Sequence, residues 1–192
     1  MLPAQDNHEA RRALNEIIRG RRTVHDFQPE PVPDYVILDA LEAARWAPNH
    51  HRTEPWRVYL LGPLVQKKIS ALNAELVQRK QGEKAAAIKL KRWNAVPGWL
   101  LLTSLRNADP QREREDYAAC CCMAQNLMLT LWAAEVGCKW TTGAVTNMPE
   151  LAQLVGFDPA LEVVVGLFWY GRALSVPDQH RRAAANFLVR VD

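Results

Sequence analysis

The segment 114–136 constrains the fold more than any other, because its apolar side chains recur at helical spacing on more than one face. A helix that is apolar nearly all round must be buried. A chain of 192 residues is long enough for one ordinary domain whose core could cover this helix. A helix rich in Ala, Leu and Met also suits a subunit interface, and the sequence leaves both forms of burial open. The apolar positions are Tyr117, Cys120, Cys121, Ala124, Leu127, Met128, Leu131, Trp132 and Val136.

The four cysteines fit neither a zinc site nor a disulfide framework. Cys120, Cys121 and Cys122 are consecutive within the helical segment, where neighbouring side chains point about 100° apart and cannot chelate one ion. We predict that these residues and Cys138 are small packing residues of the core, with a redox role as the minor alternative. Free thiols in a chain without an apolar signal segment favour a reducing, cytoplasmic compartment.

The pattern of apolar residues predicts a single domain spanning residues 1–192, without internal repeats or a linker. Residues 1–7 are expected to be a disordered lead-in, and the charged residues 81–92 are expected to be mobile. We predict helices over 9–19, 34–45, 63–80, 114–136 and 147–155, and strands over 57–61, 99–105 and 161–169.

Net charge and hydropathy exclude two classes of partner. The formal charge is +3, from 24 Lys and Arg against 21 Asp and Glu, which is too mild to favour nucleic acid. No stretch approaches the roughly 18 apolar residues of a membrane span. We therefore expect neither nucleic acid nor a membrane as a partner, and a small molecule as the ligand.

The first motif that carries chemistry is Arg21-Arg22-Thr23, which directly follows a predicted helix that ends at Gly20. Two adjacent guanidinium groups offer forked donors that match the oxygens of a phosphate, and the threonine hydroxyl adds another donor. An arginine pair alone is more often a solvated helix end. The pair therefore predicts a phosphate site only in combination with a second motif.

The second motif is the loop 47–56, which runs into the predicted strand 57–61. Prolines at both ends stiffen it, and donors and acceptors lie between them, including His50 and Thr53. His50 and His51 could be metal ligands, but neither a glutamate nor a third histidine stands at ligand spacing in the sequence. We therefore expect no metal site.

Two further segments are candidates for a ligand site. Thr141, Thr142 and Gly143 combine hydroxyl groups with a glycine, which lets a flat ligand approach the backbone. Gly171 and Arg172 follow the last predicted strand, and Arg172 alone could equally be an ordinary charge at a strand end. Most of the seven tryptophans should lie in the core, with one or two lining the ligand cleft.

The arginine motif and the loop motif together resemble the nitroreductase family of flavin enzymes, over about residues 16–172. The chain is most similar to the short, minimal members, the NAD(P)H nitroreductases. The resemblance implies that Arg21, Arg22 and Thr23 bind the FMN phosphate, and that His50 and Thr53 contact the flavin. It further implies ring-side donors at Thr141, Thr142 and Gly143, and a second phosphate-side donor at Gly171 and Arg172. Glu54 stands where the family often has glutamine, and no arginine follows Trp140.

The same resemblance implies an α+β fold, with a mostly antiparallel sheet of four or five strands flanked by helices. It implies a homodimer with FMN at the subunit boundary and a tail, residues 173–192, that reaches the partner. Hydride would pass from NAD(P)H to a nitroaromatic, quinone or similar flat acceptor by a ping-pong mechanism, with no catalytic side chain. The alternatives are a dehalogenase, enone reductase or flavin-consuming synthase, or a non-catalytic flavin-binding protein. The acceptor, the choice of NADH or NADPH, and an ordered lid at 80–92 stay open.

Overall fold

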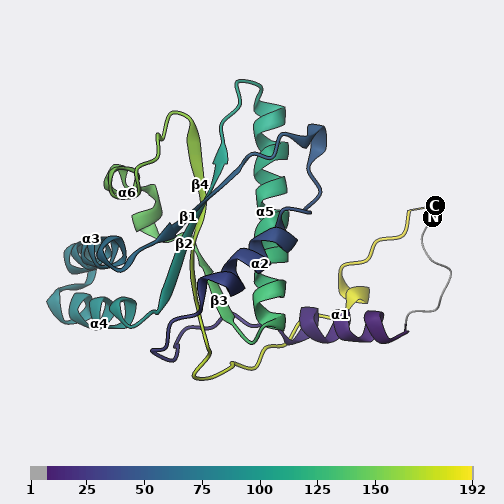
Figure 1. The fold of residues 1–192 in the computed structure, drawn as a ribbon, viewed down its shortest axis with the longest axis horizontal. Coiled ribbons are helices and arrows are strands. Elements are labelled where there is room, and N and C mark those ends of the chain that lie inside the picture. Colours follow the sequence, from purple (N-terminus) through teal and green to yellow (C-terminus); the bar gives the residue numbers. More distant parts are fainter. Residues whose placement is uncertain (1–7, 192) are drawn as a thin grey trace.

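A four-stranded antiparallel sheet lies between two layers of helices in the computed structural model, which describes residues 8–191 (Figure 1). The strand order is β1-β2-β4-β3. The strands are β1 (Trp56–Leu61), β2 (Gly98–Leu105), β3 (Gly137–Thr141) and β4 (Glu162–Gly171). The α+β class and the antiparallel sheet predicted from the sequence are confirmed.

The helices divide between the two faces of this sheet (Figure 1). On one face lie α3, α4 and α6, and on the other lie α5 and α2, with α1 projecting beyond the lower end of α5. The helices are α1 (His8–Gly20), α2 (Asp34–Ala44), α3 (Pro63–Gln81), α4 (Glu83–Asn94), α5 (Pro110–Ala133) and α6 (Pro149–Val155). Three short 3-10 turns, η1 (His50–Arg52), η2 (Ala144–Asn147) and η3 (Ala184–Asn186), complete the elements.

The two central strands separate two hydrophobic clusters. Leu100 and Leu102 of β2 point toward α2 and α5, whereas Trp99 and Leu101 point toward α3 and α4. This alternation is the two-residue period of a strand that is buried on both faces, and it explains the continuous apolar run in the sequence. The sheet is therefore the wall between two separate cores.

The long helix α5 begins earlier and ends earlier than predicted. Asp109 caps its first turn, because its Oδ1 accepts a hydrogen bond from the Gln111 amide at 2.9 Å, and Pro110 occupies the first helical position. One face is buried against the sheet and α2, including Leu127 and Leu131. The opposite face leaves Tyr117 38% exposed. Within one chain, therefore, only part of the surface of α5 is buried.

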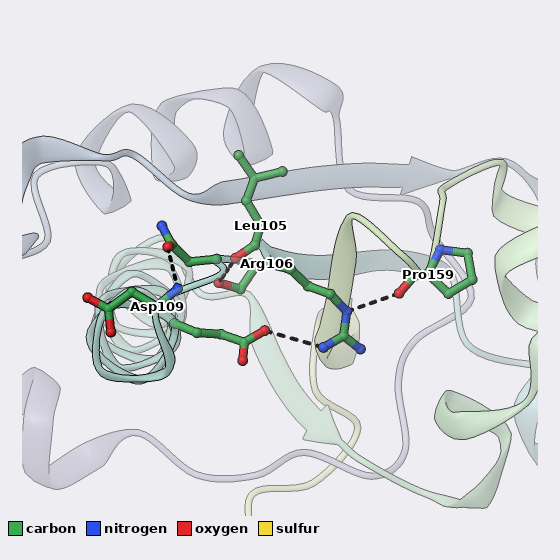
Figure 2. Close-up of polar contacts among 7 residues, drawn as sticks. Leu105, Arg106, Asp109 and Pro159 are labelled. Atoms are coloured by element: carbon green, nitrogen blue, oxygen red, sulfur yellow. Dashed lines mark hydrogen bonds and ion pairs between the residues drawn. The ribbon is translucent and has the colours of Figure 1, made fainter.

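Arg106 fixes the start of α5 to the start of β4. Its Nε donates to the carbonyl of Pro159 at 3.0 Å, and its Nη1 lies 3.3 Å from the carboxylate of Glu113 (Figure 2). Its backbone amide donates to the carbonyl of Leu161 at 2.8 Å. The segment between β2 and α5 is therefore a short, well-anchored turn.

Two predictions about local structure were wrong. The charged residues expected to be mobile over 81–92 form α4, which packs on α3 and buries Ala86 and Trp93. No strand was predicted over 137–141, where the structure has β3, an edge strand that pairs with β4. Among the cysteines, Cys120 and Cys138 are buried as predicted, but Cys122 is exposed. The predicted lead-in at residues 1–7 lies outside the described residues.

The helix α1 and the C-terminal tail lie side by side, away from the sheet (Figure 1). Within its described length α1 buries none of its residues, and Leu14 and Ile18 are 54% and 47% exposed. The tail also presents exposed apolar side chains, including Phe187 and Val189. No helix within residues 8–191 combines the length and apolar character needed to cross a membrane.

Candidate functional site

The exit of α1 is pinned to the edge strand β3. Thr23 pairs with Cys138 in a parallel bridge, and the amide of Val24 donates to the carbonyl of Cys138 at 3.2 Å. A methyl group on Gly20 would meet Nε1 of Trp132 at 3.3 Å, so helix and tryptophan pack closely here. This anchoring holds the half-buried Arg21 and Arg22 at a fixed place on the molecule.

Arg21 and Arg22 line a cleft of about 770 Å³ between α1, α5 and the tail. Three more arginines join them there, and none of the residues described along its wall is a carboxylate. We call this the arginine cleft. Its lining consists of Ile18, Arg19, Arg21, Arg22, Gln125, Gln179, Arg181, Arg182 and Ala183.

The orientation of Arg22 follows from the end of α1. Its guanidinium donates to the backbone carbonyls of Arg19, at 2.5 Å, and of Arg21, at 3.0 Å. The last carbonyls of a helix lack partners within the helix and carry partial negative charge, so a cation is favourable there. Arg22 is thereby held in one orientation, with further donors left for a ligand.

The donor set of the arginine cleft suits a phosphate group. Five guanidinium groups without a carboxylate among the described lining residues would repel one another, and a dianionic ligand relieves that repulsion. The phosphate end of FMN therefore fits the residues that are present. Arg181 and Arg182 join the cleft because the tail folds back onto α1, which nothing in the local sequence indicates.

Arg172 lies in a different cleft from Arg21 and Arg22. It forms an ion pair with Glu135 at 3.2 Å and lines a cleft of about 420 Å³ that also includes Trp132. A methyl group on Gly171 would meet Cγ of Pro97 at 2.6 Å, so this glycine is required by packing. The structure therefore does not bring Gly171 and Arg172 into the arginine cleft.

Thr141, Thr142 and Gly143 lie at the far end of β3 from the arginine motif. Gly137 is opposite Gly171 and Thr141 is opposite Leu167, so the strand spans roughly 13 Å between them. Thr141 is half-buried, whereas Thr142 and Gly143 are exposed. The carbonyl of Gly143 accepts hydrogen bonds from the amide and hydroxyl of Thr146, at 2.9 and 2.8 Å. β3 thus runs from the residues predicted to bind the FMN phosphate to the residues predicted to lie beside the flavin ring.

The loop 47–56 is docked on the N-terminal half of α5. The Thr53 hydroxyl donates to the buried carboxylate of Asp116 and accepts from Nδ2 of Asn49 at 3.0 Å. Oδ1 of Asn49 accepts from the amide of Glu54 at 2.7 Å. The Thr53 hydroxyl therefore has partners within the chain, while His50 is exposed.

The loop 47–56 lies near the upper end of α5, whereas α1 lies near its lower end (Figure 1). The loop binds α5 at Asp116, whereas the cleft includes Gln125 of the same helix. At about 1.5 Å per residue these two positions lie roughly 14 Å apart along the helix. The two motifs that carry the resemblance are therefore not gathered around one point.

Known proteins resemble this chain in both sequence and fold. The family model described as the Nitroreductase family matches residues 18–172. The chain is 32% identical over 159 residues to YfhC of Bacillus subtilis (strain 168), whose name gives NAD(P)H nitroreductase as an assumed activity. That alignment covers 81% of this chain and 82% of YfhC.

Two solved structures share the fold. The nitroreductase-like family protein from Bacillus cereus has a TM-score of 0.81 and 26% identity, over 93% of this chain and 95% of its own. The FMN-dependent nitroreductase NfnB from Mycobacterium smegmatis, in complex with NADPH, has a TM-score of 0.75 and 16% identity, over 95% of this chain and 100% of its own. With most of its length matched by the family model and by YfhC, this chain belongs to the nitroreductase family.

Proposed function

We propose that this chain is an FMN-dependent oxidoreductase that takes hydride from NAD(P)H and passes it to a nitroaromatic, quinone or similar flat acceptor. The observation that carries the proposal is the arginine cleft, with five guanidinium groups and no carboxylate among its described lining residues. A cofactor phosphate is the kind of anion that such a cleft binds. The FMN and NADPH of the M. smegmatis relative support the choice of cofactor and donor.

The proposed binding residues follow the length of β3. Arg21 and Arg22 hold the phosphate, together with Arg181 and Arg182 of the tail, and the adjacent Thr23, which is exposed, adds its hydroxyl group. Toward the other end of the strand, Thr141, Thr142 and Gly143 supply hydroxyl and backbone donors beside the ring. Gly171 is opposite Gly137, at the end of β3 nearer the proposed phosphate site. Arg172 can leave its exposed ion pair with Glu135 and donate to the phosphate.

We propose that two copies of the chain complete the site. The loop 47–56 docks on α5 at Asp116, roughly 14 Å along the helix from Gln125 of the arginine cleft, and it leaves His50 exposed. A second copy can bring its loop 47–56 to the ring of a cofactor whose phosphate lies in the first copy. The exposed apolar residues of α1 and of the tail 173–191 support such a homodimer.

When bound, FMN supplies the hydride chemistry, and the protein supplies binding, orientation and electrostatics. The arginines neutralise the phosphate and fix the cofactor in one position. The hydroxyl groups of Thr141 and Thr142 donate toward charge that develops on the ring. No side chain acts as an acid or base, and donor and acceptor use the same place in turn, which is a ping-pong order. The free thiols support the proposal of a reducing cytoplasmic setting.

The first test is the visible spectrum of the purified protein with FMN, recorded without oxygen before and after NADH or NADPH is added. Flavin absorption that copurifies and bleaches with either nucleotide is the expected result, and addition of a nitroaromatic or quinone should restore it. A protein that retains no FMN contradicts the cofactor proposal. A protein that retains FMN but is not reduced by either nucleotide contradicts the proposed donor.

A further inference from the structure

We propose that His50, His51 and Glu115 form a binding site for a divalent transition-metal ion of the zinc type. One possible ligand atom from each of these residues lies within 4.8 Å of the others. The two histidines come from the loop 47–56, and the glutamate comes from α5. From the sequence the two histidines were possible ligands without a third, because the carboxylate is supplied by a helix distant in the chain.

The backbone of the loop is shaped to bring the two imidazoles together. His51 has φ 64° and ψ 0°, in the left-handed region, and Arg52 and Glu54 have φ of 54° and 45°. This turn leaves the ring centroids of His50 and His51 only 3.9 Å apart. Left-handed conformations cost energy in residues other than glycine and persist where the surroundings enforce them, often at ligand sites.

Hydrogen bonds enforce this loop conformation. The side chain of Asn49 bridges to the Glu54 amide and to the Thr53 hydroxyl, at 2.7 and 3.0 Å. The same hydroxyl donates to Asp116, which is buried and is the direct neighbour of Glu115 on α5. The loop and the helix turn that carry the three ligands are therefore joined next to the site, one residue from Glu115 and two residues from His51.

The carboxylate of Glu115 has a partner of its own that orients it. Nε2 of Gln111, one turn earlier on α5, donates to Oε1 of Glu115 at 3.2 Å. This contact leaves the second carboxylate oxygen available to an ion. Hydrogen bonds that orient a ligating carboxylate are a regular feature of metal sites and contribute to their affinity.

The donor set selects the class of ion. Two imidazole nitrogens and one carboxylate oxygen suit zinc and similar transition ions, whereas calcium and magnesium prefer oxygen ligands alone. Around a tetrahedral zinc ion, with ligand bonds of about 2.0 to 2.2 Å, ligand atoms lie roughly 3.5 Å apart. The exposed side chains of His50 and His51 can close the remaining distance by rotation. A fourth position stays open to solvent.

This site is compatible with the role proposed for His50 beside the flavin and does not depend on it. An imidazole that binds an ion through one nitrogen keeps an N–H on the other. Bound metal would fix that tautomer and fasten the loop more firmly to α5. The metal proposal can therefore fail while the FMN proposal holds, and the reverse.

The test is equilibrium dialysis of the purified full-length protein against zinc chloride, with bound zinc measured by elemental analysis. Soft thiolates compete for zinc, so the parent protein carries Cys121→Ala and Cys122→Ala. We expect one zinc ion per chain in this parent. His51→Gln and Glu115→Gln should each weaken its affinity at least about tenfold, and Gln111→Ala should weaken it by about tenfold.

The matched control is His180→Gln, which removes an exposed histidine that lies 3.6 Å from Asp178 in the tail. It should leave stoichiometry and affinity unchanged. Circular dichroism of each variant establishes that the fold is retained, which these exposed or half-buried substitutions should allow. The proposal is overturned if the parent binds no zinc, or if His51→Gln and Glu115→Gln bind zinc as the parent does.

Discussion

At the residue scale, Arg21 has the clearest assignment, because it lines the arginine cleft and is held by the joint between α1 and β3. Arg21→Ala removes charge-assisted hydrogen bonds worth about 1.5 to 3 kcal/mol. We expect the dissociation constant for FMN to rise about tenfold to a hundredfold, as measured by fluorescence titration of the apoprotein.

The tail arginines can be tested in the same titration. Arg181→Ala should also weaken FMN binding, because Arg181 lines the same cleft. The control is Arg79→Ala, an exposed arginine of α3 on the opposite side of the sheet, which should change nothing. If Arg21→Ala and Arg181→Ala both retain the parent affinity, the phosphate does not lie in the arginine cleft.

Tyr59 gives a prediction for the dependence of stability on pH. Burial, followed by the hydrogen bond and charge of Glu162, raises the pKa of Tyr59 to about 12. Its hydroxyl donates to both carboxylate oxygens, at 2.9 and 3.0 Å. A pKa raised by folding stabilises the protein fully below the unfolded value of about 10, and this stabilisation is lost as the pH rises through 12.

The measurement is urea unfolding of the parent and of Tyr59→Phe at several pH values. The parent should be the more stable protein at pH 8, by about 1 kcal/mol for the lost hydrogen bond. The difference should shrink as the pH approaches 12. Tyr170, whose pKa burial also raises to about 12, is unchanged in both proteins, so its contribution cancels. A constant difference across this range would contradict the assignment.

At the element scale, the start of α5 depends on Asp109. Its carboxylate accepts from the Gln111 amide, one of the helix amides that lack a partner within the helix. Asp109→Ala should lower the free energy of unfolding by about 0.5 to 2 kcal/mol. Asp109→Asn keeps an accepting oxygen and should cost much less. Equal losses in both variants would show that charge, not the cap, is what matters.

The elements with a strong local signal were predicted well from the sequence. The buried strand β2 reads as one apolar run, and α3 begins at Pro63 after Gly62 as expected. The helix α4 was missed because most of its surface is charged. Its few apolar side chains pack against α3 and do not form a regular stripe in the sequence. The edge strand β3 was missed because it has only five residues and begins with a glycine.

The candidate site was predictable only where its residues are close in sequence. Arg21 and Arg22 stand together in a motif, and the structure places both in one cleft. Arg181 joins them only because the tail turns back onto α1, and Glu115 meets His51 only because the loop docks on α5. Contacts between residues so distant in the sequence depend on tertiary packing, which the local periodicity of apolar residues does not predict.

At the scale of the whole molecule, one chain leaves a large apolar surface without cover. The helix α1 has 13 residues, and isolated helices of that length are marginal in water. Its apolar residues Leu14 and Ile18 are exposed, as are Phe187 and Leu188 of the neighbouring tail. A second copy of the chain would bury this surface and stabilise both segments.

The homodimer and the cofactor site should therefore be lost together. We expect a dimer at micromolar concentration in sedimentation velocity, and Leu14→Glu, which lies outside the arginine cleft, should shift it toward monomer by placing a charge in the interface. Because the proposed site needs the arginine cleft of one chain and the loop 47–56 of the other, the same variant should retain less FMN. Glu16→Gln, an exposed change on α1 that adds no charge to the interface, is the control. A parent that is monomeric yet binds FMN tightly would contradict a shared site, because the cofactor would then be held by one chain alone.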